Sequence, residues 1–100
     1  LKTETEYLVT VWPSESDQKF FNVSNQTAQF LRKKNKNCIL WLENNTKIDK
    51  QVKFALKNNI SKVVIIGENE LNNESITIKD LHINKQQTLT LKDFYKLIQT

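Results

Sequence analysis

The most apolar segment of the chain is the run 63–66, which consists of four β-branched residues and ends at the only glycine, Gly67. A continuous apolar run of this kind predicts a strand covered on both faces, and therefore a central strand of a sheet. The polar segment 68–74 is expected to form a loop. Residues 75–80 then alternate between apolar and polar side chains, which predicts a returning strand with one buried face.

Extended and helical patterns alternate before this hairpin. Residues 7–12 are aromatic and β-branched and stop at Pro13, which predicts a first strand. Apolar positions then recur at helical spacing, so we expect a helix that starts at the cap-like segment 14–17 and ends near Lys34. Residues 38–42 predict the second strand.

A second helix is predicted before the central strand. Asn45 or Thr46 can cap its start, with Asp49 at the reciprocal position. Its apolar residues share one face, and it should end near 58–59, where asparagine tolerates the left-handed conformation that stops a helix.

The pattern after the hairpin predicts one more strand and one more helix. A turn at 84–85 leads into a short strand at 87–90. The closing helix is expected to begin at Thr90, which has Asp93 as its capping partner.

Strands and helices that alternate with short connections imply right-handed crossovers and a parallel core. We therefore expect an α/β fold: a three-layer α/β/α sandwich with a mixed five-stranded sheet, mostly parallel with one antiparallel strand, and about three helices. The first and third strands should be neighbours, with a crevice at their carboxyl ends lined by Trp12, Pro13 and Gly67. The 100 residues suit a single domain, 1–100, and the polar start without methionine predicts a piece of a longer polypeptide.

The residues of the chain offer little for catalysis. A glycine-rich phosphate loop, a serine elbow and a convincingly spaced carboxylate pair are all absent from the sequence. Cys38 and His82 are single residues of their types, too few for a zinc site or an internal disulfide. We expect no catalytic residue, cofactor or metal in this chain, no membrane span, and a cytoplasmic location.

The net charge of +4 favours an anionic partner. Four lysines share the polar side of the predicted second helix, namely Lys47, Lys50, Lys53 and Lys57. One interpretation is a solvated helix face. The other is an anion site, because Lys50 and Gln51 lie in the first turns, where free amides and the helix dipole attract phosphate.

Nine residues between positions 50 and 81 stand in a recognisable register. They are Lys50, Gln51, Ala55, Gly67, Glu68, Glu70, Lys79, Asp80 and Leu81. This pattern resembles the C-terminal anticodon-binding domain of class IIa aminoacyl-tRNA synthetases, and most of all that of histidyl-tRNA synthetase. The element order is similar over about the whole chain.

The resemblance implies a tRNA anticodon stem-loop as partner, and a parent ligase whose separate catalytic domain uses ATP and Mg²⁺ and forms a homodimer. The residues it assigns to tRNA contact are Glu70, Lys79, Lys50, Gln51, Lys47 and Glu68. A carboxylate such as Glu70 can accept two hydrogen bonds from a guanine edge, while Lys79 can donate to a base carbonyl or a phosphate. The alternative for Glu70 is a loop carboxylate that caps nearby amides.

The sequence departs from the family pattern at a few positions. Glycines common after the first two helices are replaced by Asn35 and Asn59, which can adopt the same left-handed backbone. A hairpin glycine has become Asn73 or Glu74, and Asp49 stands where a second basic residue is common.

Three other functions remain open at this point. One is a regulatory or accessory synthetase-like domain, as in certain kinases and polymerase subunits. A second is the anticodon domain of a threonyl-, prolyl- or glycyl-tRNA synthetase. A third is a small-ligand or protein-interaction α/β domain, which would show no salt-dependent tRNA binding.

Overall fold

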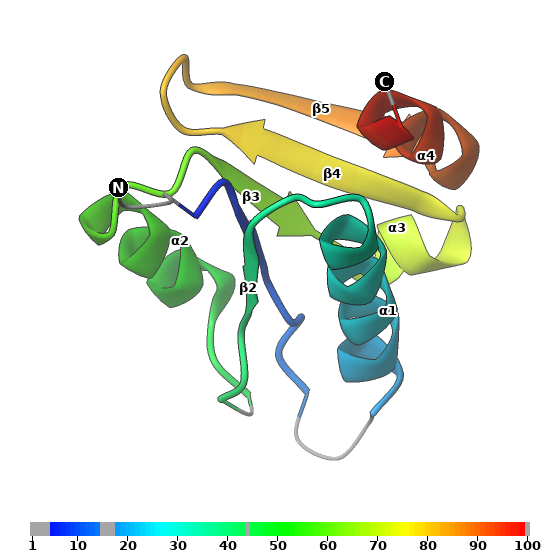
Figure 1. Ribbon diagram of the computed structural model, residues 1–100. Helices are drawn as coiled ribbons and strands as arrows, with labels where there is room; N and C mark the ends of the chain where they lie inside the picture. Colours follow the sequence, from blue (N-terminus) through cyan, green and yellow to red (C-terminus); the bar gives the residue numbers. More distant parts are fainter. Residues whose placement is uncertain (1–4, 15–17, 44, 100) are drawn as a thin grey trace.

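The computed structural model describes residues 5–14, 18–43 and 45–99, and its centre is a five-stranded sheet in the order β2-β1-β3-β4-β5 (Figure 1). The strands are β1 (Tyr7–Val9), β2 (Cys38–Leu40), β3 (Lys62–Ile65), β4 (Ser75–Asp80) and β5 (Lys85–Thr90). β1 pairs in parallel with β2 and β3, whereas β4 is antiparallel to both β3 and β5. The prediction of a mixed sheet with one reversed strand, and of neighbouring first and third strands, is confirmed.

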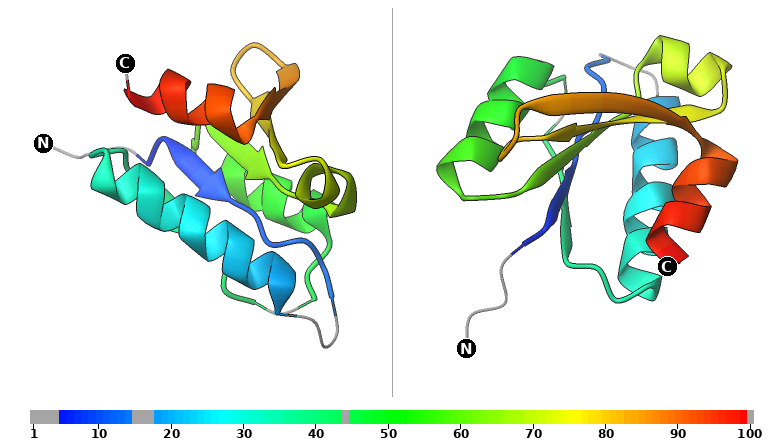
Figure 2. Two further views of the ribbon diagram at one scale, coloured as in Figure 1. Left: turned by 90° about the vertical axis from the view of Figure 1, so that its right-hand side faces the viewer. Right: turned by 90° about the horizontal axis from the view of Figure 1, so that it is seen from above.

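Helices cover both faces of the sheet. They are α1 (Lys19–Lys33), α2 (Ile48–Lys57), α3 (Glu68–Asn72) and α4 (Leu91–Gln99). α1 and α4 pack on one face and α2 packs on the other, as the two views in Figure 2 show. The three-layer sandwich is therefore as predicted, with a short fourth helix, α3, in addition to the three expected.

The strands divide the core because their side chains alternate between the two faces. Val9 and Val64 contribute to the larger cluster under α1 and α4, where Phe94 is fully buried. Leu8 and Val63 point the opposite way, into the smaller cluster under α2. The central position inferred for the 63–66 run follows from this two-sided burial.

Two local predictions are wrong. Residues 68–74 are not a plain loop, because α3 forms there, with the Glu70 carboxylate accepting a hydrogen bond from the Gly67 amide at 2.8 Å. Neither Asn45 nor Thr46 caps α2: the N-cap is Lys47, without a side-chain cap. The Thr46 hydroxyl instead donates to the Glu43 carbonyl at 3.4 Å.

Other helix and strand ends differ by a few residues. β1 and β2 stop at Val9 and Leu40, before the ends of their apolar runs, and β5 begins already at Lys85. The cap-like segment 14–17 falls mostly outside the described residues, since 15–17 are among those not described. The predicted start of the last helix is confirmed, because the Asp93 amide donates to Thr90 Oγ1 at 3.1 Å.

Three residues that stand where the family commonly has glycine adopt a left-handed backbone. Asn35 and Asn59 have φ angles of 62° and 57°, which confirms both predicted helix stops. Of the two candidates in the hairpin, Glu74 takes the positive angle, with φ of 50°. The fold is thus preserved with non-glycine residues in conformations that glycine adopts more easily.

Candidate nucleic-acid interface

The face of β4 and β5 that lies opposite α1 and α4 is polar. Ile76 and Ile78 are buried in the larger core, so Thr77 and Lys79 belong to the other face. On that side α2 packs against the cluster over β1 and β3 and leaves the neighbouring β5 residues exposed. The open face therefore carries hydroxyl, amide and ammonium groups next to the end of α3.

Glu70 lies at the border of this face and is held by two hydrogen bonds. Oε1 accepts from the Gly67 amide at 2.8 Å, and Oε2 accepts from Thr77 Oγ1 at 3.1 Å. The capping role considered as the alternative for Glu70 is thus present. A carboxylate has about four acceptor positions, so these two bonds leave room for a ligand, and recognition of a base by Glu70 stays a prediction.

Lys79 lies on the same face as Thr77 and is half-buried. It pairs across the sheet with Val63 on β3 and with Gln86 on β5. Two residues along a strand correspond to about 7 Å, so Lys79 follows Thr77 at roughly that distance. The fold brings Glu70 and Lys79 to one surface with Thr77 between them.

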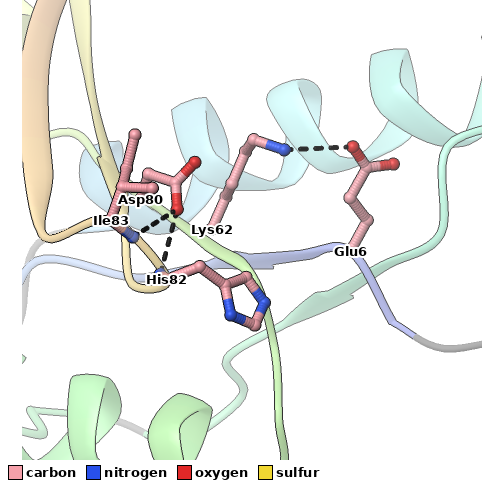
Figure 3. A network of polar contacts seen from close by, with 5 residues as sticks. All are labelled: Glu6, Lys62, Asp80, His82 and Ile83. Carbon is pink, nitrogen blue, oxygen red and sulfur yellow. Dashed lines mark hydrogen bonds and ion pairs between the residues drawn. The ribbon is translucent and has the colours of Figure 1, made fainter.

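The residues after Lys79 have structural roles that account for the Lys-Asp-Leu pattern (Figure 3). The Asp80 carboxylate accepts hydrogen bonds from the His82 and Ile83 amides at 3.0 and 3.4 Å, which fixes the turn between β4 and β5. Leu81 packs against the smaller core cluster, and its amide donates to the Ser61 carbonyl at 2.8 Å. His82 is exposed at this turn.

Gln51 is fully buried, so its side chain acts inside the protein. Its amide oxygen accepts from the Val11 amide at 3.0 Å, and its nitrogen donates to the carbonyls of Val11 and Thr46 at 2.8 and 2.9 Å. Gln51 was predicted to contact tRNA, but its buried side chain can only position the backbone of Val11 and Thr46. It joins the start of α2 to the chain just beyond β1.

Lys47 and Lys50 are exposed at the start of α2. They line a shallow depression of about 530 Å³ together with Asn45, Asp49 and Lys53. Asp49 reduces the positive charge of this depression. The anion site predicted here remains a prediction.

Trp12 lies between the residues at the start of α2 and those around Glu70. Val11 is bound by Gln51, and the next side chain, Trp12, packs over Gly67. A Cβ atom on Gly67 would lie 2.9 Å from Trp12 Cε3 and 3.0 Å from Glu70 Oε1. Gly67 has a φ of −94°, so glycine is required here for close approach and not for a left-handed backbone.

Similarity to known proteins agrees with this geometry. The family model described as anticodon binding domain matches residues 8–100. The chain belongs to the anticodon-binding domain family. The family resemblance inferred from the sequence is confirmed.

Three similar proteins are longer than this chain, which matches one part of each. Over 85 residues the chain is 33% identical to the histidine–tRNA ligase of Methanococcus aeolicus, a match that covers 85% of the chain and 20% of the ligase. The crystal structure of histidyl-tRNA synthetase from Nostoc sp. PCC 7120 superposes with a TM-score of 0.81 at 26% identity, covering 96% of the chain and 22% of that protein. The threonine–tRNA ligase of Campylobacter jejuni is 26% identical over 57 residues, or 57% of the chain and 10% of the ligase. The chain thus spans no more than about a fifth of these proteins.

Two polar residues of the open face of β4 and β5 were not identified from the sequence. Gln86 lies directly opposite Lys79, and Thr88 lies directly opposite Thr77. Both are exposed. In the sequence, Gln86 and Thr88 are two residues apart, which places them on one face of β5. Only the register with β4 shows that this is also the face of Thr77 and Lys79. Glu68, which was predicted, is exposed at the first position of α3.

The marked pKa shifts of the domain lie away from this face. Burial, followed by the nearby charge of Glu6, raises the pKa of Tyr7 to about 12. Burial also raises the pKa of the Cys38 thiol, which Arg32 opposes, and the thiol donates to the Ala28 carbonyl at 3.5 Å. A raised pKa favours an unreactive thiol, and the Cys38 side chain packs against the larger core cluster.

None of the helices in the described ranges, 5–14, 18–43 and 45–99, is long and apolar enough to cross a membrane. Within the same ranges, His, Cys, Asp and Glu side chains form no group of three that could hold a metal ion.

Proposed function

We propose that this chain is the anticodon-binding domain of a histidine–tRNA ligase and that it acts by recognition of tRNA. The observation that carries the proposal is the match of the anticodon-binding family model to residues 8–100. The similarity to the M. aeolicus and Nostoc proteins supports histidine as the amino acid of the parent enzyme. In this proposal the domain itself contains no catalytic residue.

The remainder of the parent protein supplies the chemistry in this proposal. A separate catalytic domain binds ATP and Mg²⁺ and attaches histidine to tRNA in a cytoplasmic homodimer. The anticodon stem-loop and this catalytic domain are the two partners of the chain. The proposal is supported by the small share, 20%, of the M. aeolicus ligase that the chain matches.

The open face of β4 and β5 provides the chemistry of recognition. Single-stranded loops are recognised through unstacked bases and hydrogen bonds to their edges. Glu70 reads a guanine edge as a hydrogen-bond acceptor, and Lys79 makes a less base-specific contact to a carbonyl or phosphate oxygen. Lys47 and Lys50 add phosphate contacts at the start of α2, where the helix dipole also favours an anion.

A threonine–tRNA ligase is the second candidate for the parent. It is supported by the C. jejuni relative, although the identity of 26% extends over 57 residues only. The two candidates differ in the tRNA that the domain prefers. Comparison of tRNAs specific for histidine and for threonine therefore distinguishes them.

The test is a titration of the chain with each tRNA at low and at physiological salt. Binding to phosphates releases counterions, so affinity should fall as salt rises. Replacing Lys47 and Lys50 together by alanine should reduce the salt slope by about 1.4 to 1.8, at roughly 0.7 to 0.9 per phosphate. Replacing Lys92 and Lys96, exposed on α4, removes the same charge from another face and should leave the slope unchanged.

Two results would contradict the proposal. If the affinity did not change between the two salt concentrations, the proposed contacts to tRNA phosphates would be wrong. Equal effects of the two lysine pairs would show that binding follows net charge and not the α2 surface.

A further inference from the structure

We propose that Thr88 is a specificity-determining residue of the open face, and that Thr77 is a positioning residue that fixes which hydrogen-bonding group Thr88 presents. This inference rests on the proposed function, which it extends to two residues outside the predicted site. The two hydroxyls are 2.8 Å apart, and Thr77 Oγ1 is 3.1 Å from Glu70 Oε2. Together they form a relay, Thr88–Thr77–Glu70, that crosses from β5 to α3.

The direction of the relay follows from the number of protons. An ionised carboxylate only accepts hydrogen bonds, so the bond between Thr77 and Glu70 uses the single hydroxyl proton of Thr77. Thr77 must then accept from Thr88, whose own single proton is used in turn. The second bond could run either way if considered alone. The carboxylate therefore decides that Thr88 is left with acceptor lone pairs only.

Exposure separates the roles of the two threonines. Thr77 is 4% exposed, so a ligand cannot reach it. Thr88 is exposed on the same face as Lys79 and lies at the solvent end of the relay. A ligand on this face meets acceptors at Glu70 and Thr88 and a donor at Lys79.

This pattern selects one of the four RNA bases. Guanine is the only standard base with two adjacent donors on one edge, N1–H and the 2-amino group; adenine, cytosine and uracil offer one donor group on the corresponding edge. An acceptor pair formed by Glu70 and Thr88 therefore fits the edge of an unstacked guanine. We assign the 2-amino group to Thr88 and N1–H to Glu70.

Inosine provides the test because it keeps N1–H and lacks only the 2-amino group. The affinity of the chain is measured for an anticodon stem-loop with guanosine, and for loops in which each guanosine in turn is replaced by inosine. For one guanosine, the wild-type chain should lose about three- to tenfold in affinity, the range of one net hydrogen bond. Thr88→Val, which replaces the hydroxyl by a methyl group of similar size, should reduce this loss to less than about twofold.

Variants of Thr77 test the relay itself. Thr77→Val releases the Thr88 proton, so Thr88 can rotate and present a donor, and discrimination against inosine should fall although Thr77 is out of reach of the ligand. Thr77→Ser keeps the hydroxyl and should retain the wild-type discrimination. Gln87→Ala, on the same strand but on the opposite face, is the matched control and should also retain it.

A measurement without ligand tests the same hydrogen bond. In urea unfolding, the loss of stability for Thr77→Val combined with Thr88→Val should be smaller than the sum of the two single losses, because both changes remove one shared bond. Simple additivity would overturn the relay.

The failure of this inference and that of the proposed function give different results. Wild-type discrimination that persists in Thr88→Val and Thr77→Val would overturn the relay and leave tRNA recognition intact. A stem-loop that does not bind at all would overturn the proposed function and the inference with it.

Discussion

The buried amide of Gln51 forms hydrogen bonds with both backbone groups of Val11, at 3.0 Å to the amide and 2.8 Å to the carbonyl. These two bonds replace the strand partner that Val11 lacks beyond the end of β1. A third bond, to the Thr46 carbonyl at 2.9 Å, holds the segment that enters α2. One side chain thus joins the carboxyl end of β1 to the start of α2, where Lys47 and Lys50 lie.

Removal of this amide is expected to destabilise the domain. Gln51→Leu keeps the size of the side chain but removes three hydrogen bonds, two to the backbone of Val11 and one to the Thr46 carbonyl, at a cost of about 1–3 kcal/mol. Urea unfolding measures the change. Gln29→Leu, at an exposed position of α1, is the control and should stay within about 0.5 kcal/mol of wild type. A similar effect of both substitutions would contradict the structural role of Gln51.

Gly67→Ala should disturb the contact between Trp12 and α3. The added methyl group would lie 2.9 Å from the Trp12 ring, and overpacking of this kind costs about 1–3 kcal/mol. Trp12→Leu removes most of the clashing ring and should make the alanine less harmful in the double variant than in the single one. The measurement is a double-mutant cycle in urea, and independent effects would show that the two residues do not touch.

Asn59 is expected to tolerate glycine but not valine. Its φ of 57° suits glycine, whereas a β-branched residue is strained there by about 1 kcal/mol or more. Thermal unfolding of Asn59→Gly and Asn59→Val gives the comparison. Asn58, which has a negative φ, is the matched position, and the difference between its Gly and Val variants should be smaller. Equal melting temperatures for the two Asn59 variants would contradict the left-handed helix stop.

Glu70 and Lys79 should give different signatures when they are replaced in the parent enzyme. Glu70→Gln keeps an oxygen for the Gly67 amide but adds donors, so discrimination against a changed anticodon base should fall by roughly 1 to 3 kcal/mol. Lys79→Ala should weaken the binding of tRNAs with any anticodon to the same extent, and should lower the salt dependence of binding by about one ion. Aminoacylation efficiency with wild-type and anticodon-substituted tRNA measures both. An unchanged ratio in a folded Glu70→Gln enzyme would leave the carboxylate with its capping role only.

The stability of the domain should decrease at high pH through Tyr7. Burial raises its pKa from 10.0 to about 12, so the unfolded chain loses this proton more readily than the folded one. The stabilising contribution is complete below pH 10 and is lost as the pH rises towards about 12. The unfolding free energy of wild type minus that of Tyr7→Phe should therefore fall from about pH 9 to about pH 11. A constant difference would show that Tyr7 titrates alike in both states.

Much of the fold was predictable from the sequence, because its signals are local or follow from connectivity. The 63–66 run indicated a central strand, the alternation at 75–80 indicated β4, and Asn35 and Asn59 were identified as helix stops. The family resemblance was inferred from the Lys-Gln, Gly-x-x-Glu and Lys-Asp-Leu motifs, which begin at Lys50, Gly67 and Lys79. Each of these inferences depends on residues close in sequence or on spacing along the chain.

The tertiary structure decided which polar groups meet. Glu70 was expected in a loop, but it lies in α3, and its carboxylate accepts hydrogen bonds from the Gly67 amide and the Thr77 hydroxyl. Gln51 was predicted to contact tRNA. In the folded chain it is fully buried and bonds to the backbone of Val11, a partner that only the tertiary structure reveals. Hydrogen-bond partners far apart in sequence cannot be found from local patterns, because one residue of strand register moves every side chain to the opposite face.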